Sequence, residues 1–205
     1  METKVGVMPM THRICFTLLQ SLPREQALSM VKRLQELNEK ERRAANTVKN
    51  QLTKIVSGGQ TGTDRAALDC AIQFGLEHGG WCPAGRIAED GVIPQHYQLN
   101  ELAEAGYKQR TRQNIIESDG TLILNLGELD GGTLATSRLA KHLQKPHIVL
   151  QLDSDDLEDD VASVISWLAQ SQIKVLNVAG ARESKRQGSY QLAREFLQQL
   201  FKVIN

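Results

Sequence analysis

Two glycine-rich segments have the residue types and spacing that suit phosphate binding. The first runs from Ser57 to Asp64 with the sequence SGGQTGTD, and the second is Gly131-Gly132-Thr133. Glycine lets a backbone turn sharply and approach a ligand, and the first N–H groups of a following helix have no partner within it. Because the helix dipole also favours negative charge there, two such segments on neighbouring strands predict one shared phosphate site. The alternative for the first segment is a tight turn in which Thr61 and Asp64 form a capping box.

Cationic and amide side chains near the predicted strand ends could complete this site. Arg86 follows a short strand and a glycine-containing turn, and Arg182 and Lys185 follow the last strand. Arg110 and Asn114 stand four residues apart, which places them on one face of a helix. These arginines could form charge-assisted hydrogen bonds to phosphate or carboxylate, and the alternative for each is an ordinary surface position.

Several known kinds of site do not fit these segments. A P-loop needs a lysine after its last glycine, but Thr63 follows Gly62, and the dinucleotide fingerprint needs a glycine where Ser57 stands. The histidines and cysteines show no metal-ligand spacing. The acidic stretch 153–160 is interpreted as the dipole-stabilised start of a helix rather than as a magnesium site. We therefore expect no metal site.

The elements that must position these residues follow from the pattern after residue 53. Short β-type runs alternate there with helical stretches and glycine-rich joints, as in βαβ units with a parallel sheet. The predicted strands cover residues 54–57, 80–82, 121–125, 146–152 and 173–178. The predicted helices cover residues 63–75, 96–105, 111–117, 133–143, 157–170 and 189–203. In such sheets ligands bind at the carboxyl ends of the strands, where both glycine-rich segments lie.

Residues 1–52 differ from the rest of the chain. From Pro23 to Leu52 the apolar residues recur at near-heptad spacing, which predicts a helix. We expect a helical N-terminal extension over residues 1–52 and one domain over residues 53–205. The extension packs either on this domain or on a second copy of it, so a homodimer is one of two arrangements.

Composition narrows the class of partner. The chain has 205 residues, with 24 Lys or Arg, 24 Asp or Glu and a formal net charge of +0, which argues against a general binder of nucleic acid or membrane surfaces. Aromatic residues make up only 4%, so few side chains could stack on bases. No apolar run approaches the ~20 residues that span a bilayer. The odd set Cys15, Cys70 and Cys82 without a CxxC pair favours a reducing compartment, and we expect a cytoplasmic protein.

Five stretches together resemble a known family. They are residues 56–69 (VSGGQTGTDRAALD), Arg110-Thr111 with Asn114, residues 118–123 (SDGTLI), residues 131–133 (GGT) and residues 177–184 (NVAGARES). In order and spacing these stretches resemble the putative molybdenum carrier family, the circularly permuted YpsA-like branch of the SLOG superfamily. The resemblance covers about residues 54–203. It implies a Rossmann-like α/β fold, with a mostly parallel sheet and helices on both faces.

The resemblance also implies a site for a phosphorylated nucleotide-like or pterin ligand, with molybdenum cofactor or a nucleotide as the cofactor. It adds Arg65 and Ser184 to the residues considered above. The expected ligand-binding residues are Ser57, Gly58, Gly59, Gln60, Thr61, Gly62, Asp64, Arg65, Arg86, Arg110, Asn114, Gly131, Gly132, Thr133, Arg182 and Ser184.

Three functions stay open at this point. In the first, a carrier-like protein binds its ligand with backbone N–H groups on phosphate and arginines that neutralise it. In the second, a hydrolase cleaves a nucleotide or nucleoside phosphate with Asp64 as acid or base. A distant branch, resembling cytokinin-activating phosphoribohydrolases, carries glutamates shortly after its Gly-Thr, whereas Leu134, Ala135 and Thr136 follow here, which argues against N-glycosidic hydrolysis. In the third, a regulatory or assembly module acts through its N-terminal helix.

Overall fold

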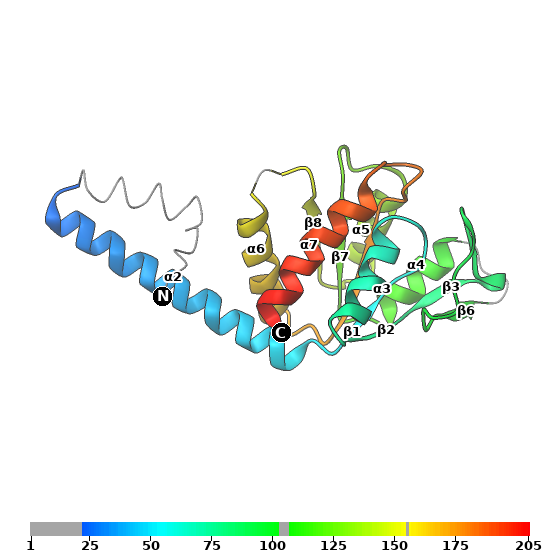
Figure 1. Ribbon diagram of the computed structural model, residues 1–205, viewed down its shortest axis with the longest axis horizontal. Coiled ribbons are helices and arrows are strands. Elements are labelled where there is room, and N and C mark those ends of the chain that lie inside the picture. Colours follow the sequence, from blue (N-terminus) through cyan, green and yellow to red (C-terminus); the bar gives the residue numbers. More distant parts are fainter. Residues whose placement is uncertain (1–21, 103–106, 155) are drawn as a thin grey trace, which may run out of the picture. The chain divides into compact units, whose positions relative to one another are not determined.

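The computed structural model describes residues 22–102, 107–154 and 156–205, so Cys15 lies outside the described residues. The predicted N-terminal helix is confirmed as α2 (Arg24–Gln51), one helix of 28 residues, coloured blue to cyan in Figure 1. The chain divides between Arg43 and Ala44 into two compact units. The last turns of α2, from Ala44 onward, belong to the second unit, where Val48 is part of the hydrophobic core and Ala44 packs against it.

A five-stranded parallel sheet forms the centre of the second unit and confirms the predicted sheet. Its strands stand in the order β2 (Glu77–Gly79), β1 (Lys54–Val56), β9 (Val175–Gly180), β7 (Gly120–Asn125) and β8 (His147–Gln151). Every neighbouring pair is parallel. All six residues of β7 are buried, as expected for a parallel strand that is covered on both faces.

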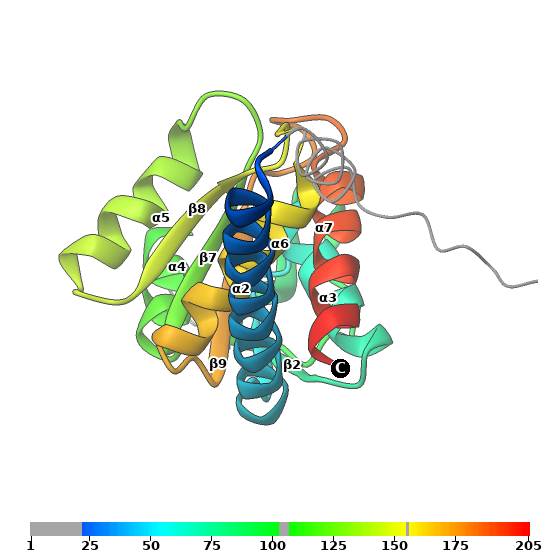
Figure 2. The same cartoon turned by 90° about the vertical axis from the view of Figure 1, so that its left-hand side faces the viewer.

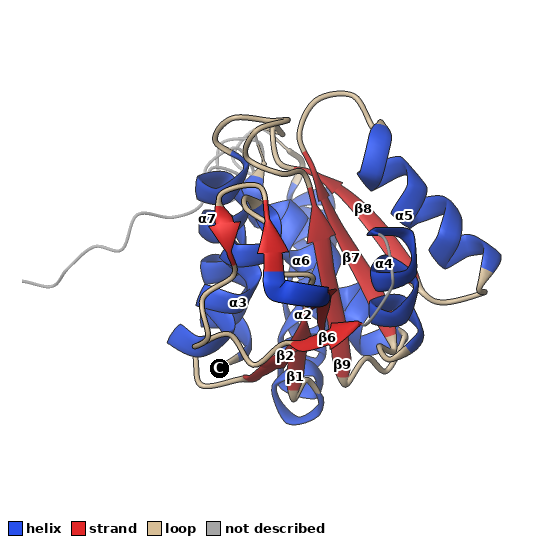
Figure 3. Ribbon diagram, turned by 90° about the vertical axis from the view of Figure 1, so that its right-hand side faces the viewer, coloured by secondary structure: helices blue, strands red, loops and turns tan. Residues whose placement is uncertain are grey.

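Helices cover both faces of this sheet (Figure 3). One face carries α3 (Thr63–Gln73), α6 (Leu157–Gln170) and α7 (Ser189–Ile204), and Figure 2 shows α3 and α7 adjacent to one another. The other face carries α4 (Tyr107–Ile116) and α5 (Gly131–His142). α7 buries Phe196, Leu197, Leu200 and Phe201 against the sheet, which is the spacing of a single helix face. No described helix is long and apolar enough to cross a membrane.

The segment between β2 and α4 differs from the prediction. The strand expected at 80–82 is β3 (Trp81–Pro83), and β2, which was not predicted, comes directly before it. Gly80 separates the two strands, with a φ of +123° and a Cβ position only 2.2 Å from the carbonyl oxygen of Ser57. The helix expected at 96–105 is wrong over residues 96–102: residues 96–99 are turn and loop, and Asn100–Leu102 form β6, which pairs with β3 in parallel. Residues 103–105 of that helix lie outside the described residues.

The side chain of Arg86 explains this departure from helix. A 3-10 turn, η1 (Ala84–Arg86), and a small antiparallel pair, β4 (Ile87–Ala88) with β5 (Gly91–Val92), follow β3. The buried guanidinium of Arg86 then donates hydrogen bonds of 2.8–3.1 Å to four backbone carbonyls, those of Ile93, Pro94, Tyr97 and Leu99. These carbonyls converge on one point, which the regular backbone of a helix does not allow.

Candidate functional site

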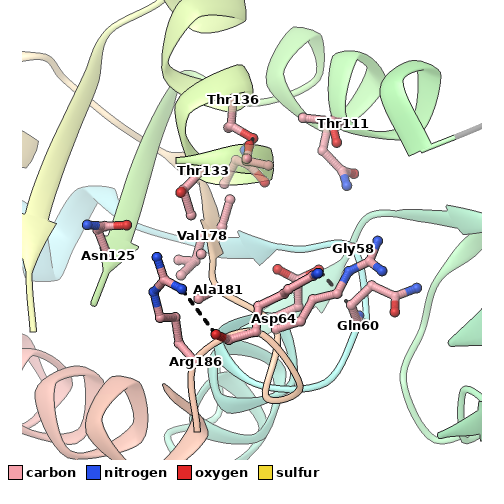
Figure 4. Close-up of a pocket in the computed structure, with 18 of the residues that line it drawn as sticks. Gly58, Gln60, Asp64, Thr111, Asn125, Thr133, Thr136, Val178, Ala181 and Arg186 are labelled. Carbon is pink, nitrogen blue, oxygen red and sulfur yellow. Dashed lines mark hydrogen bonds between the residues drawn. The ribbon is translucent and has the colours of Figure 1, made fainter. Parts of the chain in front are cut away.

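A cavity of about 340 Å³ lies where the carboxyl ends of β1, β9 and β7 meet α4 and the start of α5 (Figure 4). This is the edge of a parallel sheet at which ligands bind in open α/β folds. The residues that line it are Gly58, Gln60, Asp64, Arg110, Thr111, Asn114, Asn125, Asp130, Gly131, Gly132, Thr133, Thr136, Asn177, Val178, Ala179, Gly180, Ala181, Arg182, Lys185 and Arg186.

The N-terminus of α5 opens into this cavity. Gly131 and Gly132 line the cavity, and a Cβ built on either would meet no described atom within 4 Å outside its own chain neighbours and helix backbone. Asp130 precedes the helix, but its side chain does not cap it; the carboxylate accepts a 3.0 Å hydrogen bond from Arg186 instead. The first amides of a helix have no partner within it, so α5 offers a positively polarised end to a ligand.

The N-terminus of α3 is built differently. A Cβ on Gly62 would lie 2.4 Å from the carbonyl oxygen of Ala181, and the N–H of Thr63 donates to that same carbonyl at 3.2 Å. The alternative considered for this segment, a capping box with Thr61, does not form, since Gly62 stands at the cap position and no side chain caps the helix. The carboxylate of Asp64 instead accepts the N–H of Gln60 at 3.3 Å. The first amide of this helix is therefore bonded to the chain's own carbonyl at Ala181.

Asp64 lies buried on the wall of the cavity beside Arg110. Burial raises the pKa of its carboxyl above the ordinary 3.8, and the charges of Arg110 and Arg182 oppose this rise only in part. The guanidinium of Arg110 donates to the carbonyl oxygen of Gly58 at 3.3 Å. A Cβ on Gly58 would lie 2.7 Å from both the Arg110 guanidinium carbon and an Asp64 oxygen. Glycine is thus needed at position 58 to bring these two charged groups together.

Positive charge exceeds negative charge around the cavity. Its described lining holds four cationic side chains, Arg110, Arg182, Lys185 and Arg186, against two carboxylates, Asp64 and Asp130. Four minus two leaves an excess of two positive charges when both carboxylates are ionised. The hydroxyls of Thr133 and Thr136 lie one turn apart on α5 and donate to the carbonyls of Asp130 and Gly132 at 2.7 and 2.8 Å. Their oxygens can still accept hydrogen bonds from a ligand.

The structure brings nine of the expected ligand-binding residues to this cavity. They are Gly58, Gln60, Asp64, Arg110, Asn114, Gly131, Gly132, Thr133 and Arg182. The other seven do not line it. They are Ser57, Gly59, Thr61, Gly62, Arg65, Arg86 and Ser184.

Residues outside the cavity hold its loops in place. Ser57 donates from its hydroxyl to the carbonyl of Val178 at 2.7 Å and so ties the end of β1 to β9. Gly59 has a φ of +73°, and a Cβ there would lie 2.5 Å from the side chain of Leu99. Arg65 forms two hydrogen bonds of 2.7 and 2.8 Å to the carboxylate of Asp90. With the Arg86 bonds described above, these contacts position the loop after β1.

Glu89 joins that loop to the one after β9. Its carboxylate accepts hydrogen bonds from the hydroxyl of Thr61, and from the hydroxyl of Ser184 at 2.6 Å and its N–H at 3.2 Å. Partial burial acts to raise the pKa of Glu89, but the bonds from Ser184 and Thr61 outweigh it and lower that pKa. Thr61 and Ser184 therefore have a visible role in fixing the loop that carries Arg182.

Sequence reasoning missed several lining residues. Asn125 and Asn177 are polar side chains within buried strands, and that pattern was a usable signal. Thr136 stands three residues after Thr133 on α5, which is the spacing of one helix face. Lys185 was considered but not included in the expected set. Arg186 had no local signal, because it reaches the cavity through its bond to Asp130 from a distant part of the chain.

The donor set of this cavity consists of amide, hydroxyl, guanidinium and ammonium groups, which suit phosphate oxygens. Among the described residues, no group of three or more His, Cys, Asp or Glu side chains could hold a metal ion. The two described cysteines, Cys70 and Cys82, are buried thiols outside the cavity lining.

Residues 55–201 match the Circularly permutated YpsA SLOG family. The chain belongs to this family. A solved structure of a putative molybdenum carrier protein from Syntrophus aciditrophicus SB is 44% identical, with a TM-score of 0.71, over 74% of this chain and 95% of that one. No curated protein matches the chain. The matched span contains every residue that lines the cavity, whereas α2 lies before it.

Proposed function

We propose that this protein binds and carries a small phosphorylated ligand, nucleotide-like or a pterin, in the cavity at the ends of β1, β9 and β7. The observation that supports this most is the N-terminus of α5, where Gly131 and Gly132 leave the first amides uncovered beside an excess of cationic side chains. Such an arrangement suits a phosphate group, because the amides donate hydrogen bonds and the helix dipole favours negative charge.

The two sides of the cavity favour different parts of such a ligand. The α5 side, with Thr133 and the cations of the loop after β9, suits phosphate. Asp64 on the α3 side would repel phosphate, but a carboxylate accepts hydrogen bonds from hydroxyl or amine groups. We therefore orient the ligand with its phosphate at α5 and its sugar or ring at Asp64.

The name of the solved relative links that protein to molybdenum. If the cargo of the present protein contains molybdenum, the donor groups of the cavity fit its phosphate and other oxygen atoms. Arg182 and Lys185 would then hold the phosphate, and Asn114 and Thr136 would contact the remaining polar groups.

Hydrolysis of a nucleotide is a second candidate, and one observation favours it. Asp64 is a buried carboxylate with a raised pKa on a cavity wall, which is a common property of catalytic acids and bases. Turnover separates the two candidates. An enzyme consumes a nucleoside monophosphate and loses that activity in Asp64→Asn, whereas a carrier gains stability with its ligand and releases it unchanged.

Native mass spectrometry of the purified full chain tests the proposal. We expect a ligand that leaves on activation in the gas phase and whose mass includes phosphorus. In Gly132→Leu the added side chain enters the cavity, so the adduct should be lost, while Asn46→Ala on the exposed face of α2 should retain it. A chain that carries no adduct and shows no calorimetric binding of AMP or inorganic phosphate would refute phosphate binding here.

A further inference from the structure

A second hollow runs between α4 and α5 beside the cavity. It has a volume of about 870 Å³. Four residues, Thr111, Gly131, Gly132 and Thr136, line both the cavity and this groove. In Figure 4, Thr111 and Thr136 come from facing helices at this end of the cavity. A ligand with its phosphate at the N-terminus of α5 therefore lies next to both hollows.

The groove has a distinct chemistry. Its cationic side chains are Lys108 and Arg112 from α4 and Arg138 from α5. Its apolar side chains, Leu134, Ala135 and Leu139, all come from α5, and none of the described residues that line it is Asp or Glu. A strip of apolar side chains beside cations suits a planar ring. Arginine also stacks its guanidinium on planar rings.

Contacts on both sides of α4 keep the groove open. The ammonium group of Lys145 donates to the carbonyls of Ile116 and Ser118 at 3.0 and 2.8 Å, which fixes the far end of α4 to the loop after α5. The side-chain amide of Asn114 accepts the N–H of Trp81 at 2.7 Å and donates to its carbonyl at 3.2 Å, which ties α4 to β3. The two helices are thus held apart by bonds outside the groove.

We propose that the groove between α4 and α5 binds the second half of the ligand, so that the ligand is a dinucleotide joined through a pyrophosphate. This rests on the proposed function, because the pyrophosphate is placed at the N-terminus of α5. One half then lies in the cavity toward Asp64, and the ring of the other half lies on Leu134 and Leu139. The guanidinium groups of Arg112 and Arg138, which line the groove, can stack on that ring, because a purine offers the planar face that such stacking needs.

Calorimetric titration of the full chain with AMP and with diadenosine pyrophosphate tests this inference. The dinucleotide should bind at least about tenfold more tightly than AMP, well above the roughly twofold statistical gain from its two identical halves. The double variant Arg112→Glu/Arg138→Glu should remove this advantage and leave the affinity for AMP within about threefold of the wild type.

A matched control separates the groove from net charge. Lys174→Glu/Lys202→Glu makes the same change in charge at two exposed lysines that line neither hollow, and it should preserve the dinucleotide advantage. If AMP and the dinucleotide bind equally, or if the groove variant weakens both alike, the inference is overturned while the proposed function stands. If neither nucleotide binds, both fail. If the protein is a dimer that Leu139→Glu separates without changing either affinity, the groove is a subunit interface and the inference is also overturned.

Discussion

Replacing Gly132 with leucine should weaken ligand binding and leave the fold intact. Gly132 is the second residue of α5, its φ lies outside the left-handed region, and a Cβ there meets no described atom within 4 Å beyond its neighbours. Leucine favours a helix over glycine by up to about 1 kcal/mol. For a unit of about 160 residues, each kcal/mol shifts Tm by about 2–4 °C. The free variant should therefore melt at the wild-type temperature or up to about 4 °C above it.

Binding should respond in the opposite direction. The isobutyl group projects over the first amides of α5, where we place the phosphate, and should weaken AMP at least about tenfold, or 1.4 kcal/mol. Differential scanning fluorimetry gives Tm and isothermal titration calorimetry gives Kd. Asn46→Ala, which also improves helix propensity, should raise stability without changing Kd. A Gly132→Leu variant that binds AMP as tightly as the wild type would refute the placement of phosphate at α5. A variant that unfolds would refute the claim that a side chain at position 132 has space around it.

Three further variants test the charged groups. Burial raises the pKa of Asp64 above 3.8 in the folded protein. The protein's free energy of unfolding should therefore fall as pH rises from about 4 through the raised pKa of Asp64. Urea titrations of Asp64→Asn should lack this component, and identical pH slopes for the two proteins would contradict it. Arg86→Met leaves four carbonyls without their donor, so it should lower Tm by at least about 6 °C, or about 3 kcal/mol. The Kd of the folded variant for AMP should change little. A Tm equal to that of the wild type would show that the Arg86 hydrogen bonds do not stabilise this segment. Glu89→Gln should lower stability by about 0.5–1 kcal/mol at pH 7 in chemical denaturation, and this difference should shrink below pH 4.5, where the wild-type carboxylate becomes protonated.

The layers of the fold could be predicted because they follow local patterns. The strands at β7 and β8 and the helices at α3, α5, α6 and α7 have apolar periodicity and glycine-rich boundaries, and the structure bears them out within a few residues. The segment from β3 to β6 has no such pattern. Its backbone is set by Arg86, which collects carbonyls up to 13 residues away, and a long-range interaction of this kind leaves no local periodicity.

The two glycine-rich segments also differ through long-range contacts rather than through local sequence. Both were expected to present open helix N-termini, and their sequences alone look equivalent. The structure distinguishes them through partners from elsewhere in the chain, since Ala181 accepts the N–H of Thr63, whereas Asp130 before α5 bonds through its carboxylate to Arg186 and does not cap that helix. Which of two similar motifs remains available to a ligand depends on tertiary contacts, so it could not be predicted from spacing.

The residues after Gly132-Thr133 connect the question of catalysis with the shape of the ligand site. The resembling phosphoribohydrolases carry glutamates shortly after this pair, and Leu134, Ala135 and Thr136 stand here. In the structure Leu134 and Ala135 line the groove, and Thr136 lines both the groove and the cavity. Carboxylates at these positions would place negative charge beside the open end of α5 and oppose a pyrophosphate. In the arrangement proposed above, Leu134 and Ala135 instead give the ligand an apolar surface beside this end of α5, so the positions that lack candidate catalytic groups are the ones that suit a longer anionic ligand.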